Sequence, residues 1–132
     1  MDLFLKDKVI IVSGGAKGIG EAIVLALARE GAIPVIIGRN LQDNLTALSK
    51  AGKGSQVVAE LSDPRQCATA IDTIVAQYGR IDGLVNNAGV NDGINLEHGS
   101  YEGFMASLHK NVVHYYLLAH HALPFLKGSR GA

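Results

Sequence analysis

The stretch KVIIVSGGAKGIG, residues 8–20, decides the fold. Its first part, from Lys8 to Ser13, is an unbroken run rich in β-branched residues, which predicts a strand buried on both faces. Glycines follow closely, and a helical pattern then runs from Ile19 to Glu30, where Gly31 ends it. A strand, a glycine-rich turn and a helix in this order are typical of a turn that holds the paired phosphates of a dinucleotide at a helix N-terminus.

The remaining sequence repeats this alternation of short apolar runs and longer periodic segments. Three further strands are predicted, at residues 33–37, 56–61 and 81–85. The next helices are predicted to begin after residues that cap a helix N-terminus, namely Asn40, Asp63 and Ser100. This pattern predicts an α/β fold, a Rossmann-type doubly wound parallel sheet with helices on both faces and strand order 3-2-1-4. In that order the apolar strand 81–85 lies at an edge, where unpaired backbone groups favour association.

The composition indicates one globular domain and excludes several classes of function. The 132 residues are 48% hydrophobic and 18% charged, and 12 basic residues balance 12 acidic ones. A net charge of zero gives no electrostatic attraction for nucleic acid or an acidic membrane surface. The chain has one cysteine, and its first apolar run, from Val9 to Val12, is too short for a signal or membrane segment. We therefore expect a cytoplasmic protein with no nucleic-acid or membrane partner.

The last predicted helix is long and is followed by a polar tail at residues 127–132. Four histidines lie in it, but no pair has the i, i+4 spacing of a metal site and no carboxylate is near. We interpret His109, His114, His120 and His121 as surface or interface residues and predict no metal site. The apolar positions of this helix are Tyr101, Phe104, Met105, Leu108, Val112, Tyr115, Ala119 and Ala122, and we expect part of this apolar stripe to be exposed.

The glycine spacing G-x-x-x-G-x-G, from Gly14 to Gly20, resembles the first turn of the short-chain dehydrogenase/reductase family, which usually has Thr where Ser13 stands. Two further family motifs occur in the expected places. Asn86-Asn87-Ala88-Gly89 follows the fourth predicted strand, and Asn111 lies within the last helix. The resemblance covers the whole chain. It implies an oxidoreductase that transfers a hydride between a nicotinamide cofactor and a small-molecule alcohol or carbonyl substrate.

The resemblance also implies a role for each matching residue. The glycine turn wraps the pyrophosphate and adenosine ribose, Glu60-Leu61 lies near the adenine with Glu in place of the family's Asp, and the Asn87–Gly89 loop lies against the ribose. Asn111 matches the catalytic Asn, which helps hold a water chain leading to the catalytic Lys. The predicted cofactor-binding residues are Ser13, Gly14, Gly15, Ala16, Lys17, Gly18, Ile19, Gly20, Arg39, Glu60, Leu61, Asn87, Ala88 and Gly89.

The end of the second predicted strand decides which cofactor is expected. An acidic residue there binds the ribose 2′-hydroxyl of NAD, but this chain has Arg39 and no carboxylate in the stretch 36–40. A guanidinium suits a 2′-phosphate because it forms charge-assisted bidentate hydrogen bonds. Lys17 adds a second positive charge from the glycine turn. We predict a preference for NADP(H), with NAD(H) as the alternative.

The family's proton-transfer motif, Tyr-x-x-x-Lys, does not occur in these residues. The positions four residues after Tyr78, Tyr101, Tyr115 and Tyr116 hold Asp, Met, Ala and His. We therefore interpret residues 1–132 as the N-terminal part of a single NAD(P)-binding Rossmann domain, inactive alone. The alternative is a non-catalytic dinucleotide-binding or interaction module. The resemblance also implies a homo-oligomer, a tetramer or dimer packed through the long helices.

A polar loop after the Asn-Asn-Ala-Gly motif bears on the substrate. The run N-D-G-x-x-L-E at residues 91–97 resembles the L-fucose-type sugar dehydrogenase branch of the family. Its polarity favours a hydroxylated substrate over a steroid or fatty acyl chain. A sugar is therefore the expected substrate class.

Overall fold

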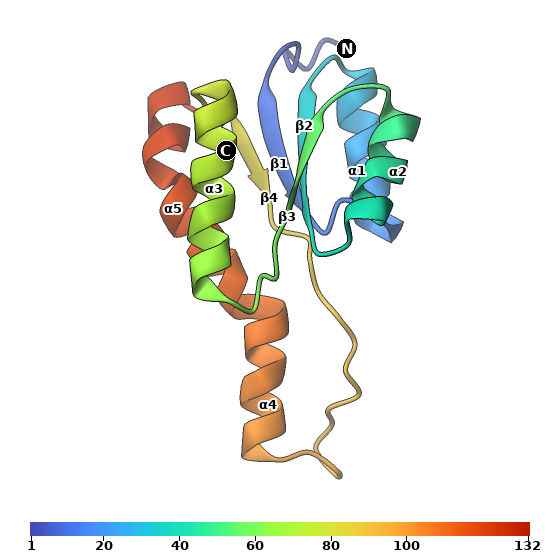
Figure 1. Ribbon diagram of the computed structural model, residues 1–132, viewed down its shortest axis with the longest axis vertical. Coiled ribbons are helices and arrows are strands. Elements are labelled where there is room, and N and C mark those ends of the chain that lie inside the picture. Colours follow the sequence, from blue (N-terminus) through green and yellow to red (C-terminus); the bar gives the residue numbers. More distant parts are fainter.

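The computed structural model describes all residues from Met1 to Ala132, and its parallel sheet has the order β3-β2-β1-β4 (Figure 1). The predicted Rossmann-type architecture and strand order are confirmed. In chain order the elements are β1 (Val9–Ser13), α1 (Gly18–Arg29), β2 (Ile33–Gly38), α2 (Leu41–Ala51), β3 (Ser55–Val58), α3 (Pro64–Tyr78), β4 (Gly83–Val85), α4 (Tyr101–Leu108), a π-helical segment η1 (His109–Val113) and α5 (His114–Ser129).

Helices cover both faces of the sheet, so the central strands are apolar on both sides. Figure 1 shows α1 and α2 on one face and α3 and α5 on the other. Alternate residues of β2 therefore enter different cores: Val35 and Ile37 pack towards α3 and α5, whereas Ile36 packs with Val24 of α1. Val35, Ile36 and Ile37 are all fully buried. This two-sided burial explains why the strand reads as a continuous apolar run.

Helix starts follow the predicted capping residues. The side chain of Asn40 accepts a hydrogen bond from the backbone N–H of Asp43, that of Asp63 from Arg65, and that of Ser100 from Gly103. The helix α1 differs, because Lys17 at its N-cap makes no side-chain capping bond. Its first backbone N–H groups are therefore left for other partners.

Three sequence expectations need correction. The third strand ends at Val58 rather than at residue 61, because the chain turns off the sheet before the Asp63 cap. The first half of the polar tail at 127–132 is helical, since α5 continues through Pro124 to Ser129. The single long helix is interrupted by the η1 segment, whose wider turns change the register of the faces. As a result Val112 is exposed, while His114, Leu118 and Ala122 are buried.

The strand β4 lies at the edge of the sheet, as expected, and the backbone of Ala132 pairs with its free side. Asp82, just before β4, accepts a 2.9 Å hydrogen bond from the Val9 backbone N–H and one of 2.8 Å from Arg80 Nε. Burial by itself raises the pKa of this carboxyl, but these bonds and the nearby Lys8 charge lower it below its ordinary 3.8. Asp82 therefore ties β1 to β4 as a carboxylate.

A membrane-spanning helix needs about 20 predominantly apolar residues, and no helix of this protein has the length and apolarity for such a span. The α4 helix is the element furthest from the sheet, and Figure 1 shows it extending beyond the main body together with the loop that precedes it. No residue of α4 is buried.

Candidate dinucleotide site

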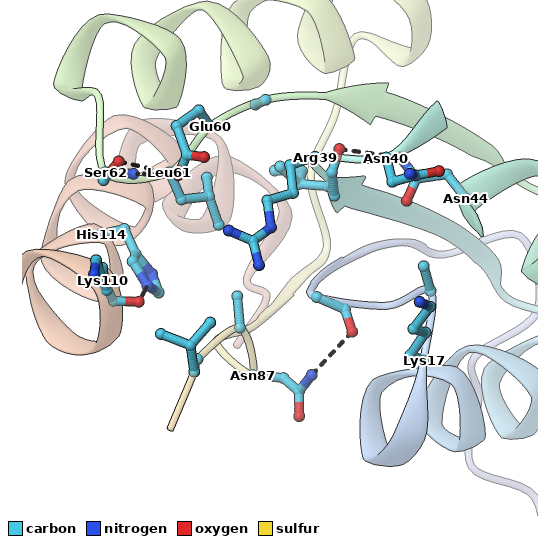
Figure 2. A pocket seen from close by; sticks show the side chains of 18 residues that line it. Lys17, Arg39, Asn40, Asn44, Glu60, Leu61, Ser62, Asn87, Lys110 and His114 are labelled. Atoms are coloured by element: carbon cyan, nitrogen blue, oxygen red, sulfur yellow. Dashed lines mark hydrogen bonds between the residues drawn. The ribbon is translucent and has the colours of Figure 1, made fainter. Parts of the chain in front are cut away.

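A cavity of about 290 Å³ lies at the carboxyl ends of the strands, where the segments after β1, β2, β3 and β4 meet (Figure 2). This is where open parallel sheets bind ligands. Three cations and one carboxylate line it, so it suits an anionic ligand. The lining residues are Gly14, Ala16, Lys17, Ile37, Gly38, Arg39, Asn40, Asn44, Ala59, Glu60, Leu61, Ser62, Asn87, Ala88, Gly89, Val90, Lys110 and His114.

The glycine turn requires glycine at two positions for different reasons. Gly14 has φ of +67°, which L side chains rarely adopt, and a Cβ there would lie 2.8 Å from Ala88 Cα. Gly20 lies so close to the turn that its Cβ would overlap the carbonyl oxygen of Gly14. The first residue allows the tight turn and the last allows α1 to pack against it, as predicted from the spacing.

Ser13 and Asn87 join the glycine turn to the loop after β4. The buried Ser13 hydroxyl accepts the backbone N–H groups of Asn87 at 3.0 Å and Ala88 at 3.1 Å. In return the Asn87 side-chain Nδ2 donates to the carbonyl oxygens of Ser13 and Gly14, at 3.1 and 3.2 Å. Two segments more than 70 residues apart in sequence thus form one rigid wall of the cavity.

Positive charge gathers around the segment after β2. The Arg39 side chain reaches into the cavity in Figure 2 and forms no ion pair. The Lys17 Nζ lies 3.0 Å from the carboxylate of Asp43 in α2, so its charge is partly compensated. Asn44, which is fully buried, donates from Nδ2 to the carbonyl of Gly38 and supports this corner.

Glu60 and Leu61 line the cavity, but the Glu60 carboxylate is turned to its own loop. Its Oε1 accepts hydrogen bonds from the backbone N–H of Ser62 at 3.2 Å and from the Ser62 hydroxyl at 3.0 Å. The Glu60 backbone N–H donates to Gln66 Oε1 at 2.7 Å. The loop after β3 is therefore stabilised by its own polar side chains.

Asn111 lies in the η1 segment and holds the loop after β4 in place. Its Oδ1 accepts the Val90 backbone N–H at 2.7 Å, and its Nδ2 donates to the Ser107 carbonyl at 3.0 Å. A Cβ on Gly89 would lie only 2.9 Å from that Oδ1, so the glycine makes this approach possible. Both polar atoms of the Asn111 side chain are thus occupied within the protein.

The structure brings together most of the predicted site residues. Ser13, Gly15 and Gly20 are buried outside the cavity wall, and Gly18 and Ile19 lie on the exposed start of α1. The lining residues that sequence reasoning missed are Ile37, Gly38, Asn40, Asn44, Ala59, Ser62, Val90, Lys110 and His114. The interpretation of His114 as a surface residue is wrong, since only 1% of it is exposed. No group of three His, Cys, Asp or Glu residues in the chain could hold a metal ion.

Comparisons with known proteins agree with this geometry. The sequence model described as short chain dehydrogenase matches residues 8–132. The chain is 34% identical to L-fucose dehydrogenase of Mus musculus over 126 residues, which are 94% of this chain and 46% of that protein. The solved structure of Cj0485 dehydrogenase superposes with a TM-score of 0.91 at 34% identity, over 99% of this chain and 51% of that one.

Two further solved structures of the same fold have cofactors named with them. The NADH-dependent reductase A1-R′ complexed with NAD has a TM-score of 0.90 at 28% identity, over 98% of this chain and 56% of that one. A metagenomic short-chain oxidoreductase in complex with NADP has a TM-score of 0.88 at 28% identity and is 60% covered. The chain spans about half the length of the proteins it matches. The match of the family model to nearly every residue shows that the chain belongs to the short-chain dehydrogenase/reductase family.

Proposed function

We propose that residues 1–132 form the cofactor-binding part of an NADP(H)-preferring oxidoreductase. The reaction is a hydride transfer between nicotinamide and an alcohol or carbonyl carbon. The observation that carries the proposal is the cavity itself, which joins the glycine turn, Arg39 and the Asn87–Gly89 loop at the carboxyl edge of the sheet. Residues 1–132 belong, in this proposal, to a single dinucleotide-binding domain.

The residues present fit a dinucleotide. The start of α1 lacks a side-chain cap, so its free N–H groups and positive dipole end favour a pyrophosphate. Ser13, Gly14, Gly15, Ala16, Lys17, Gly18, Ile19 and Gly20 build this turn, from its buried support to its exposed tip. In this proposal the adenine lies against Glu60 and Leu61 and the ribose against Asn87, Ala88 and Gly89, all of which line the cavity.

Preference for NADP(H) over NAD(H) rests on the charges near β2. Arg39 has no carboxylate partner to satisfy it, so a 2′-phosphate can take that role. Lys17 contributes less, because Asp43 already pairs with it. A charge-assisted hydrogen bond contributes about 1.5–3 kcal/mol, which corresponds to about 10- to 100-fold in affinity.

The bound cofactor supplies or accepts the hydride, and the protein positions the reactants. Asn111 orients the loop after β4 through its bond to Val90, and we propose that it is the catalytic-site Asn of this family. No Tyr here precedes a Lys by four positions, so these 132 residues lack the family's proton-transfer pair. We expect them to bind cofactor without turnover when tested alone.

The polar loop supports the proposed substrate class, and the exposed helices support the proposed self-association. The loop at 91–97 favours a hydroxylated small molecule, and a sugar is the proposed class. Large apolar side chains are exposed along α4, η1 and α5, and such a surface favours self-association into a dimer or tetramer. These side chains are Tyr101, Phe104, Val112, Tyr116 and Leu123.

Calorimetric titration with NADPH and NADH tests the proposal. We expect the protein to bind NADPH at least tenfold more tightly, and Arg39→Asp to reverse the order. Arg65→Asp is the matched control, because it makes the same charge change at an exposed residue outside the cavity wall. Absence of heat with both cofactors refutes the dinucleotide site, whereas equal or tighter NADH binding refutes only the preference.

A further inference from the structure

Asn44 is a polar residue at a position where packing alone favours an apolar one. It is fully buried in α2, where the other buried residue is Ala47. Its Oδ1 is buried and has no hydrogen-bond partner, which is unfavourable. An apolar side chain of similar size avoids this cost, so stability alone does not account for an amide here.

The hydrogen bonds of Asn44 hold the backbone on both sides of Arg39. The side-chain Nδ2 donates to the carbonyl oxygen of Gly38 at 3.1 Å. The backbone N–H of Asn44 donates to the carbonyl oxygen of Asn40 at 3.0 Å. The residue before Arg39 and the residue after it are thus both bonded to one side of α2.

This arrangement is also tied to the neighbouring strand. The Asn44 Nδ2 makes a second bond, at 3.0 Å, to Oε1 of Gln56 in β3. Gly38 fits against the amide because it has no Cβ, which would overlap Asn44 Oδ1. Figure 2 shows Arg39 extending into the cavity from beside Asn40 and Asn44. The backbone of Arg39 is therefore fixed from α2 and β3 together.

We infer that Asn44 is a positioning residue, which fixes the backbone of Arg39 so that its guanidinium points into the cavity before the cofactor binds. The inference rests on the proposed function, because it takes Arg39 to bind the 2′-phosphate. A group that is already ordered loses less conformational freedom on binding, which raises affinity. NADH lacks the 2′-phosphate, so Asn44 affects the binding of NADPH and leaves that of NADH unchanged.

The other polar contacts near Arg39 do not provide the same support. The Asn40 side chain accepts from the Asp43 backbone N–H within its own helix. Lys17 and Asp43 form an ion pair whose lysine side chain is exposed. Neither contact reaches the carbonyl of Gly38, which comes directly before Arg39. Asn44 is the side chain that does so.

Two variants that each remove one bond of the same amide test the inference. Asn44→Leu has a similar volume, removes Nδ2 and keeps the backbone bond to Asn40. We expect its NADPH affinity to fall about fivefold, the equivalent of one net hydrogen bond, and its NADH affinity to stay unchanged in calorimetric titration. Gln56→Met is the matched control, because it removes the other Nδ2 bond and leaves Gly38 bonded, so its affinity ratio should equal that of the wild type.

Three results of these titrations overturn the inference. They are an unchanged NADPH-to-NADH affinity ratio in Asn44→Leu, an equal loss of affinity for both cofactors, and the same fall in the ratio in Gln56→Met. Circular dichroism melting verifies that each variant folds. A measurement on the unmodified protein without cofactor applies if Asn44→Leu does not fold. The backbone order parameter of Arg39 from NMR relaxation should be about 0.85, and a value below about 0.6 overturns the inference.

A double-mutant cycle with Arg39→Ala separates the inference from the proposed function. If Asn44 acts through Arg39, Asn44→Leu causes no further loss of NADPH affinity in the Arg39→Ala background. A further fivefold loss there overturns the inference and leaves the dinucleotide site intact. If Arg39→Ala by itself leaves the affinity ratio unchanged, the proposed cofactor preference is wrong and the inference falls with it.

Discussion

Replacing Gly20 with alanine tests the central feature of the site, the close packing of α1 on the glycine turn. The added Cβ would lie within van der Waals distance of two groups at once. One is the Gly14 carbonyl oxygen, which it would overlap, and the other is Asn87 Nδ2 at 2.5 Å. Ordinary carbon–oxygen contacts are about 3.3 Å or longer, so the turn must move by about 1 Å.

The cost can be worked out from these contacts. Overpacking of a tight site costs about 1–3 kcal/mol. The movement also weakens the two bonds that Asn87 Nδ2 donates to Ser13 and Gly14, each contributing about 1 kcal/mol. Alanine recovers about 1 kcal/mol through its higher helix propensity. We expect the free energy of unfolding to fall by about 2 kcal/mol and the affinity for cofactor to fall by at least tenfold.

Urea denaturation and calorimetric titration of the same variant measure both effects. Gly128→Ala in α5 is the matched control, because a Cβ there meets nothing within 4 Å. We expect that control to gain about 0.5–1 kcal/mol and to bind cofactor like the wild type. If Gly20→Ala is as stable as the wild type and binds NADPH equally well, the packing argument for the turn is refuted.

Three more predictions follow from single contacts. Because the pKa of Asp82 is lowered on folding, its carboxylate stabilises the fold above the ordinary pKa of 3.8, and this stabilisation is lost as pH falls through the folded value. Asp82→Asn should therefore destabilise by about 1 kcal/mol at pH 7, and denaturation series should show the difference from the wild type shrinking as pH falls below 3.8. Asp43→Asn frees Lys17 and should raise the NADPH-to-NADH affinity ratio by about two- to fivefold, and an unchanged ratio contradicts a role for Lys17. Ser13→Ala leaves two backbone N–H groups without their acceptor and should lower the free energy of unfolding by about 2 kcal/mol. Ser13→Thr keeps a hydroxyl acceptor and should retain most of the wild-type stability. Equal urea midpoints for the two variants would contradict this prediction.

The alternating strands and helices were predictable because the relevant signals are local, whereas the strand order followed from the fold type that the glycine turn indicates. The continuous apolar runs of β1 and β2 require burial on both faces, and a capping residue precedes α2, α3 and α4. The roles of Gly14 and Gly20 follow from the absence of a Cβ, which is a property of the residue itself. Such signals depend on neighbours within a few positions.

The last helix shows where this local reasoning ends. The sequence predicts one continuous helix with an apolar stripe that includes Val112, but η1 interrupts the helix and shifts its register, and Val112 is exposed. The same shift places His114 inside the protein. No composition or spacing signal marks a π-helical segment. Its Asn111 side chain accepts a hydrogen bond from the backbone N–H of Val90, a partner 21 positions away.

The sequence alone therefore determined the elements, their alternation and the chemistry of the phosphate turn, because backbone sterics and capping act between near neighbours. Only the tertiary structure decided which distant groups meet. The pairing of Ser13 with Asn87 and the position of Glu60 arise because parallel strands end at the same edge of the sheet. Lys110 and His114 reach the same cavity from η1 and α5. The exact wall of that cavity depends on packing and helix register, which are properties of the whole fold.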